Sequence, residues 1–406
     1  MSSSPTPFSS GNSTVQDWTD DFDHTDPAWT DNPYPIWNEL RSSCPIAHTN
    51  RFDGGVFLPV RYEDVRQIAY DTEHFSSRRV VVRKVKLDAT QSSPPITSDP
   101  PAHRAARMPL LPAFNPMAVE KLEPVTRSIC AKLIDRFAGT GRCDAAVDYA
   151  QHIPTRVIAK MLGLDEDGGD AFRRWIKMAL QDGIHDSSIA LQAMQEMSVF
   201  FHSEIEARRP ANFDRNDLVC HVMNMRDKDG QPLSETEAIG MLRLILIAGI
   251  DTTWSAIGAS LWHLATHEDD RRRLVAHPEL MATAIEEFLR AYAPVMMARE
   301  VVKEVTVSGC PMNVGSMVLL SFPAANRDPE MFPDADKVQI DRQENRHAAF
   351  GLGIHRCVGS NLARMEMRVA IEEFLKRVPE FRLDTSKRTT WSEGTVRGPR
   401  ELPLLF

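Results

Sequence analysis

A glycine-rich loop around one cysteine constrains this chain more than any other segment. The loop reads Phe350-Gly-Leu-Gly-Ile-His-Arg-Cys-Val-Gly359, and a helical pattern begins directly after it. Its glycines let the backbone approach closely and turn N–H groups toward the sulfur of Cys357. The start of the following helix adds partial positive charge near that sulfur. Both effects stabilise a thiolate, the form of cysteine that binds iron, although a small buried cysteine in a glycine turn is the plain alternative.

The loop also begins like a dinucleotide-binding motif, since Gly351 and Gly353 form a G-x-G pair. Arg356 stands where that motif needs a third glycine, and no clear strand precedes the loop, which argues against a dinucleotide site. The other cysteines show no C-x-x-C pair and no zinc-finger spacing. This predicts small buried side chains at Cys44, Cys130, Cys143, Cys220 and Cys310.

Composition argues against two classes of partner. The 406 residues carry 47 basic and 56 acidic side chains, for a net charge of −9. Such a chain is unsuited to general nucleic-acid binding and is not drawn to anionic membranes. The longest apolar stretch, residues 244–250, is far shorter than the roughly 20 residues of a transmembrane helix. Because the N-terminus lacks a basic start and an apolar stretch, the sequence predicts a cytoplasmic protein.

Helical patterns dominate the chain, and no repeat or linker divides it. Residues 1–32, rich in Ser, Thr and Asp, are expected to be a flexible lead-in, and residues 33–406 one large domain. The longest helix is expected over 233–267, about 50 Å at 1.5 Å per residue, with Ser234 and Glu237 forming a capping box. The fold class is therefore mainly α with minor β. Further helices are expected over 33–41, 62–70, 116–137, 150–162, 170–180, 189–207, 278–292 and 360–376, one more after Asp99-Pro-Pro, and strands over 56–60, 301–307 and 318–321.

The middle of the longest helix is locally weak. It reads Ala248-Gly-Ile-Asp-Thr-Thr253, and glycine and threonine are poor helix formers. Threonine hydroxyls can bond to a carbonyl one turn earlier and bend the helix. The aspartate, Asp251, is costly inside an apolar helix unless it is used. A kinked core helix with a satisfied aspartate remains the structural alternative.

Three other sets of polar residues have helical spacing or a marked position. Glu287 and Arg290 lie three apart, on one helix face, where such pairs are usually solvated. His103 and Arg107 lie four apart and share a face, and each alone would most often be a surface residue. Arg299 follows shortly after Pro294, and its fork matches carboxylate geometry.

Together these motifs resemble the cytochrome P450 family, in the family's order and over roughly residues 33–406. The cysteine loop matches the family's heme loop at Phe350, Gly353, His355, Cys357 and Gly359, with valine at 358 where leucine is usual. The resemblance implies the cytochrome P450 fold, with heme b between the long central helix on one side and the cysteine loop and last helix on the other.

The resemblance also implies roles for individual residues. Cys357 is the axial ligand of the heme iron, Phe350 shields its sulfur, and Gly351 belongs to the same cofactor-binding loop. His103, Arg107, Arg299 and His355 face the heme propionates. Glu287 and Arg290 lock to Arg342 and hold the loop. Thr252 holds iron-bound dioxygen and Asp251 relays protons to it. The expected substrate-pocket residues are Leu244, Ala248, Val295, Met296, Met297, Ala298, Thr395 and Val396.

The function implied is a bacterial heme-thiolate monooxygenase. It would insert one atom of O₂ into a small hydrophobic or aromatic substrate, by hydroxylation or O-dealkylation. The chain shows no P-loop, dinucleotide fingerprint or iron–sulfur cysteine cluster, so NAD(P)H would act only through a ferredoxin, flavodoxin or flavin reductase, separate or fused. Residues 246–261 and 345–364 most resemble heme domains of self-sufficient, reductase-fused members.

Three alternatives to this function stay open. A peroxygenase would use hydrogen peroxide directly, although Asp251 and Thr252 suit oxygen activation better. A non-catalytic heme sensor has little use for a proton relay, and a helical interaction protein would carry no heme. The basic stretch Arg78, Arg79, Arg83, Lys84 and Lys86 has two interpretations, an attractor of acidic substrates or a solvated basic face, and we favour the second.

Overall fold

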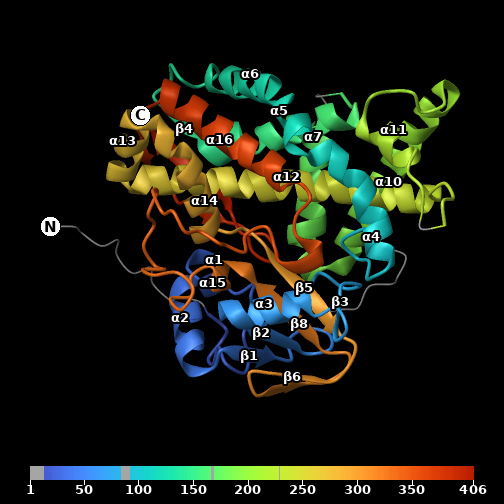
Figure 1. The fold of residues 1–406 in the computed structure, drawn as a ribbon. Helices are drawn as coiled ribbons and strands as arrows, with labels where there is room; N and C mark the ends of the chain where they lie inside the picture. The colour runs from blue at the N-terminus through green and yellow to red at the C-terminus, as the bar shows by residue number, and fades with distance from the viewer. Residues whose placement is uncertain (1–12, 84–91, 166–168, 228) are drawn as a thin grey trace.

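Helices form the larger part of the molecule, and a mixed sheet lies along one side of them (Figure 1). The computed structural model describes residues 13–83, 92–165, 169–227 and 229–406. The predicted fold class, mainly α with minor β, is confirmed.

The long helix α12, Glu235–Thr266, crosses the whole helical part (Figure 1). The predicted capping box is present, because the Ser234 hydroxyl accepts from the Glu237 N–H and the Glu237 carboxylate accepts from the Ser234 N–H. By length and composition α12 could span a membrane, but 72% of its most apolar window is buried inside the fold. It is therefore the central core helix, and it is the one such candidate within the residues described.

The remaining helices pack around α12 or cover the sheet. The helices over 62–70 and 360–376 were predicted to within a residue, whereas the helix predicted over 116–137 divides into α5 and α6 at Lys121–Leu122. The helices are α1 Pro27–Asp31, α2 Tyr34–Ser43, α3 Tyr62–Tyr70, α4 Ala102–Arg107, α5 Pro116–Glu120, α6 Glu123–Ile134, α7 His152–Leu162, α8 Gly169–Lys177, α9 Gly183–His185, α10 Ser187–Arg208, α11 Leu218–Met223, α13 Glu268–Ala276, α14 Met281–Ala291, α15 Phe322–Ala325 and α16 Ser360–Arg377.

The largest sheet has five strands in the order β1-β2-β8-β5-β3, and only the β2–β8 pair is parallel. The strand region predicted over 301–307 is confirmed in part, because β5 ends at Val301 and β6 covers Val305–Val307. The strands are β1 Ile46–Thr49, β2 Val56–Pro59, β3 Phe75–Ser76, β5 Met296–Val301 and β8 Met317–Ser321; the smaller sheets pair β6 Val305–Val307 with β7 Cys310–Met312, β10 Thr390–Trp391 with β11 Pro399–Glu401, and β12 Pro403–Leu405 with β4 Arg142–Asp144 and β9 Arg382–Leu383.

The described part of the N-terminal segment is packed, so the prediction of a flexible lead-in over 1–32 is wrong for residues 13–32. Phe22 is fully buried and Trp29 is 2% exposed. The Trp29 ring stacks edge-on against Trp37 with ring centroids 5.7 Å apart. Burying two large aromatic side chains outweighs a polar composition. Residues 1–12 lie outside the described residues.

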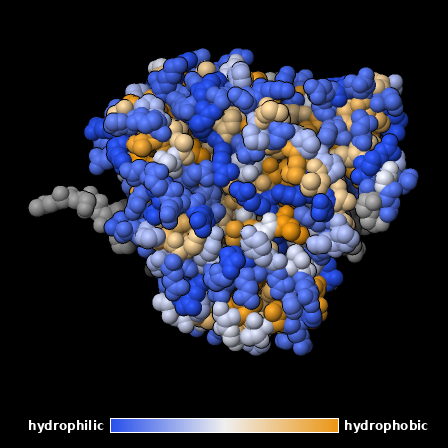
Figure 2. Space-filling model, in the orientation of Figure 1, coloured by the Kyte–Doolittle hydropathy of each residue, from blue (hydrophilic) through white to orange (hydrophobic). Residues whose placement is uncertain are grey.

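Side chains on the outside are mostly hydrophilic on the face that Figure 2 shows, with hydrophobic groups in smaller patches between the helical part and the sheet. This surface is consistent with a chain of net charge −9.

Candidate active site

The Cys357 loop is folded back on itself immediately before α16. The Cys357 N–H donates to the Phe350 carbonyl at 2.8 Å, and the Gly351 N–H donates to the Ala348 carbonyl at 2.8 Å. Gly353 has a φ of +68°, and a Cβ there would collide with the Ala69 carbonyl at the end of α3. Glycine is therefore required at 353 for both backbone conformation and close approach.

Several groups around Cys357 favour its thiolate. Its side chain is accessible, yet enough protein surrounds the sulfur that burial raises the pKa of the thiol. The Gly359 N–H, which points at the sulfur, and the guanidinium groups of Arg107, Arg364 and Arg356 act in the opposite direction and lower that pKa. A cysteine held among N–H donors and cations suits binding to a cationic metal centre.

Phe350, the first residue of this loop, contacts the charged side chain of Arg364 on α16. The Arg364 guanidinium lies 4.4 Å from the centre of the Phe350 ring. The same guanidinium forms a two-pronged salt bridge with Glu286 at 2.6 and 2.8 Å. The Arg364–Glu286 salt bridge thus holds a guanidinium against the Phe350 ring at the start of the cysteine loop.

His103, His355 and Arg299 come together although they lie far apart in the sequence. The imidazole centroids of His103 and His355 are 4.3 Å apart. Within the described part of the chain, the buried Nε2 of each ring has no hydrogen-bond partner. Arg299 is 5% exposed, and its Nη1 donates only to the Ala298 carbonyl. Three buried groups with unused hydrogen-bonding capacity thus converge from α4, β5 and the cysteine loop.

The electrostatics around His103, His355 and Arg299 favour the binding of an anion. Burial, followed by the charges of Arg299, His103 and Arg107, lowers the pKa of His355 to about 3. Burial lowers the pKa of Arg299 to about 10, with Asp99 opposing it. No carboxylate of the described residues lies within ion-pair distance of Arg299, and a buried guanidinium without an anion is costly. These donors fit the two propionates of a heme placed over Cys357.

Arg107 contacts the cysteine loop directly. Its Nη2 donates to the Arg356 carbonyl, the residue before Cys357. It therefore ties α4 to the cysteine loop, and its positive charge acts on the sulfur as well as on His355.

The middle of α12 carries Asp251 and Thr252 as the sequence indicates. The Thr252 hydroxyl donates to the Ala248 carbonyl at 2.8 Å, the one-turn-back bond that weakens a helix. Leu244, Ala248 and Thr252 lie four residues apart on one face, and all three are less buried than their neighbours Ile245, Leu246 and Ile250. That face of the core helix is the one left open to a ligand.

Asp251 is fully buried and pairs with Arg400, a residue that sequence reasoning missed. The Arg400 Nη2 lies 2.8 Å from an Asp251 carboxylate oxygen, but the angle is too poor for a hydrogen bond. Burial raises the pKa of Asp251, and Arg400 acts in the opposite direction. In the sequence, only the cost of burying Asp251 indicates that it needs a cationic partner. No residue spacing identifies Arg400 on β11 as that partner.

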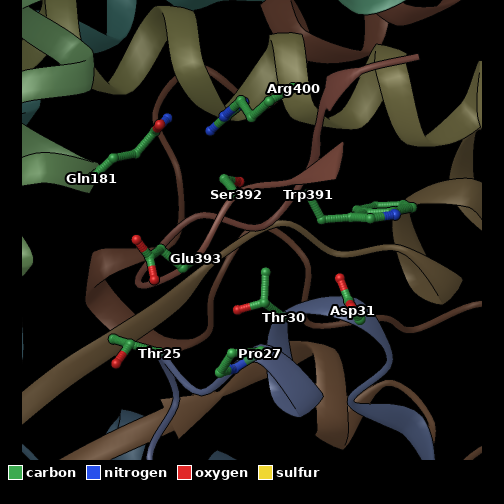
Figure 3. Close-up of a pocket in the computed structure, with 9 residues that line it drawn as sticks. All are labelled: Thr25, Pro27, Thr30, Asp31, Gln181, Trp391, Ser392, Glu393 and Arg400. Carbon is green, nitrogen blue, oxygen red and sulfur yellow. The ribbon is translucent and has the colours of Figure 1, made fainter. Parts of the chain in front are cut away.

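Arg400 also faces outward into a surface pocket. The pocket has a volume of about 260 Å³, and Figure 3 shows Arg400 and Gln181 directed toward each other across it. With its amide oxygen turned to Arg400, Gln181 accepts from Nε at 2.8 Å and from Nη2 at 3.2 Å. The guanidinium lies 4.3 Å from the Trp254 ring centre. Arg400 is therefore the link between this pocket and the buried Asp251.

The Glu287 network behind the cysteine loop is complete. The Glu287 carboxylate accepts from Arg290 at 2.8 Å with each oxygen, and from Arg342 Nε at 3.0 Å. Asn345 Nδ2 and the Gln339 N–H donate to the same carboxylate. Glu287 and Arg290 are fully buried, and the network ties α14 to the segment that leads into the cysteine loop.

Six of the predicted pocket residues lie on two adjoining segments, residues 295–298 and 395–396. Val295 and Val396 form a β-bridge, and the Met296 N–H donates to the Thr395 carbonyl at 2.9 Å. Met297 lies on the same face of β5 as Val295 and Arg299.

Met296 and Ala298 are corrected as pocket residues. Their side chains, 3% and 0% exposed, pack on the other face of β5 in the cluster that contains Phe22 and Trp29. Side chains alternate along a strand, so four consecutive residues cannot all face one ligand.

Comparisons with known proteins agree with this geometry. Residues 169–394 match the cytochrome P450 family. The chain is 33% identical over 384 residues to the mycinamicin IV hydroxylase/epoxidase of Micromonospora griseorubida, covering 91% of this chain and 94% of that protein. It is 34% identical to the vitamin D(3) 25-hydroxylase of Pseudonocardia autotrophica, covering 92% and 93%. The structure of the Bacillus subtilis polyketide cytochrome P450 PksS superposes with a TM-score of 0.85 at 28% identity, covering 95% of this chain and 99% of that one. The chain therefore belongs to the cytochrome P450 family of heme-dependent monooxygenases.

Proposed function

We propose that this cytochrome P450 inserts one oxygen atom of O₂ into a hydrophobic small molecule, with electrons from a separate or fused ferredoxin or flavin reductase partner in the cytoplasm. The observation that carries the proposal is the position of Thr252 on the open face of α12, next to the buried Asp251, while Cys357 and the propionate donors lie on other elements. The relatives named as hydroxylases support the same reaction class.

Each group has a defined part in this proposal. The heme, when bound, supplies the oxidising chemistry, which thiolate donation favours. Cys357 would hold its iron, and His103, His355 and Arg299 would hold its propionates. The Glu287 network fixes the segment that presents Cys357.

The polar residues of α12 would handle protons. Asp251 can hold a proton at its carboxylate, because burial already raises its pKa. The Thr252 hydroxyl keeps an accessible position beside the Ala248 carbonyl, where it would present a proton to a ligand bound at the open face of α12. Leu244, Val295 and Val396 would exclude water and contact the substrate.

The experiment that tests the proposal is turnover of the heme-loaded protein with a surrogate ferredoxin and its reductase under ¹⁸O₂. We expect the label to enter a hydrophobic substrate that displaces water from the heme. Label incorporation from hydrogen peroxide alone, with none from O₂, would identify a peroxygenase, and spectral binding without any oxidation would identify a sensor.

Replacing Thr252 with alanine should divert electrons from product to hydrogen peroxide. Positioned acid–base groups contribute about 10²–10⁴-fold, so we expect product per NADH to fall at least about tenfold while NADH consumption continues. Thr266→Ala is the matched control, because Thr266 makes the same bond one turn back, to Trp262, at the far end of α12. Equal coupling in the two variants would contradict the role of Thr252.

A further inference from the structure

The described arginines of the basic stretch after β3 are only partly solvated. Arg78 forms a two-pronged salt bridge with the buried Glu300 of β5 at 2.6 and 2.7 Å. Arg79 pairs with Asp53, in the turn between β1 and β2. Both arginines therefore bind this segment to the sheet. Arg78 remains 59% exposed, as a solvated face requires, whereas Arg79 is largely buried and the prediction is wrong for it. Lys84 and Lys86 lie outside the described residues.

Arg83 differs from these two arginines. It is half-buried, and its carbonyl accepts from the Asp53 N–H at 3.0 Å. Within the described residues its guanidinium makes one hydrogen bond, from Nη1 to the Gly183 carbonyl at 3.0 Å. Over residues 13–83, 92–165, 169–227 and 229–406, no carboxylate pairs with it, and its Nε and Nη2 have no acceptor. Burial lowers the pKa of Arg83, with no acidic group acting against it. Partly buried arginines are rarely left without acceptors for their N–H donors, so we expect a bound group to accept from Arg83.

The segment that carries Arg83 runs beside the strand of the expected substrate pocket. Ser76 pairs with Glu300, and the Ala298 N–H donates to the Val80 carbonyl at 2.9 Å. The Val82 side chain packs in the same cluster as Met296 and Ala298, and the Asp53 N–H donates to the Arg83 carbonyl at 3.0 Å. The segment therefore crosses the Met296 face of β5 toward the turn between β1 and β2.

Gly183, which accepts the Arg83 hydrogen bond, connects Arg83 with the segment that carries Thr395 and Val396. Gly183 begins α9, and the next side chain, Ile184, fills the space that a Cβ at Gly394 would need. Gly394 is followed by Thr395 and Val396, which bond to Met296 and Val295. Arg83 thus stands where the β3 segment, the turn between β1 and β2 and α9 meet, beside the contact of Ile184 with the Gly394 turn that leads into Thr395 and Val396.

Arg243 serves as a comparison, because both of its terminal nitrogens donate to groups of the protein. It is 7% exposed and also lacks a carboxylate partner among the described residues. Its two terminal nitrogens donate to the Ser198 hydroxyl at 2.9 Å and to the carbonyls of Met194 and Ser92 at 3.5 and 3.4 Å. Both terminal nitrogens of Arg243 thus hold α12 to α10 and to the Ser92 segment, although its Nε has no partner. Among the described residues, Arg83 has an acceptor for one terminal nitrogen.

We propose that Arg83 is an anion anchor of the substrate pocket, and that the substrate is a hydrophobic molecule with a carboxylate at the end away from the oxidised carbon; this rests on the proposed function. A guanidinium fork matches a carboxylate in shape and charge. The other pocket residues, Leu244, Val295 and Val396, offer no charge. One charged group among apolar walls fixes which end of a ligand faces the heme.

The test is spectral titration of the heme-loaded protein with matched acids and esters. The probes are dodecanoate and 4-butylbenzoate, each against its methyl ester, and the readout is the shift of the Soret band as ligand displaces water. We expect each acid to bind at least about tenfold more tightly than its ester. In Arg83→Gln the Kd of the acids should rise about 10- to 100-fold, while the Kd of the esters stays unchanged.

Arg79→Gln is the matched control, because it removes the same charge four residues earlier from an arginine whose partner is Asp53. It should leave the ratio of acid to ester affinity unchanged. The anchor is refuted if the acids bind no more tightly than the esters, if no acid shifts the spectrum, or if both variants change the ratio equally. The reduced CO spectrum of the same preparations separates the two proposals: a red-shifted band without acid preference rejects the anchor alone, and a missing band rejects the proposed function.

Discussion

Cys357→Ala should abolish the strongly red-shifted Soret band of the reduced, CO-bound protein while leaving the chain folded. The red shift requires a thiolate opposite the CO, and within the described residues Cys357 is the cysteine among the donors of the heme loop. Cys130 and Cys143, by contrast, are buried in apolar surroundings, and burial raises the pKa of Cys130 to about 12. Neither can replace Cys357 as a ligand, so the loss should be complete.

The matched control for this change is Cys310→Ala. Cys310 is half-buried on β7, at the edge of a two-stranded sheet away from the loop. That variant should keep the full band. Circular dichroism of both variants separates loss of the ligand from loss of the fold, because a folded Cys357→Ala protein that still shows the band would show that another group binds the iron.

The sequence carried much of the fold because its periodic patterns are local. Helix α3 and helix α16 were predicted to within a residue, since apolar spacing and glycine or proline boundaries fix them. The packed N-terminal segment was missed because Phe22 and Trp29 find their partners on distant elements. The split of the helix over 116–137 was missed because both halves keep helical spacing.

The parts of the candidate site that lie in one contiguous motif could be predicted from the sequence. The parts that the fold brings together from distant segments could not. The Cys357 loop and the Glu287–Arg290 pair are each read within ten residues. The convergence of His103, Arg299 and His355 came only through the resemblance. Two errors followed from ignoring strand alternation, since Met296 and Ala298 face the opposite side of β5. Arg400 could not be found, because it meets Asp251 only through the return of the last strands to α12.

Arg400→Met should destabilise the protein in a way that depends on pH. The substitution keeps the length of the side chain and its contact with Trp254 but leaves the Asp251 carboxylate buried without its cation. Breaking a buried ion pair by removing one partner costs about 3–5 kcal/mol, less whatever protonation of the carboxylate recovers. We expect the urea midpoint to fall clearly at pH 8, with a smaller fall at acidic pH.

The sign follows from the direction of the Asp251 pKa. Burial raises it in the folded protein, and Arg400 opposes that rise, so its removal moves the folded pKa of Asp251 further above the ordinary carboxyl value of about 4. A raised carboxyl pKa means that the folded state favours the protonated form, so that contribution to stability is present at low pH and lost as pH rises through the folded pKa. The gap between wild type and Arg400→Met should therefore widen from about pH 5 to about pH 8.

Two further variants assign this effect to the pair itself. In an Asp251→Asn background no charge is left uncompensated at position 251, so Arg400→Met should cost much less and its cost should no longer vary with pH. Arg400→Lys keeps the cation and should stay close to wild type in its pH dependence. A pH-independent loss that persists in the Asp251→Asn background would mean that Arg400 acts through Trp254 and Gln181 instead. In that case the pocket of Figure 3 would be joined to α12 by packing, with no electrostatic link to the proton-bearing carboxylate.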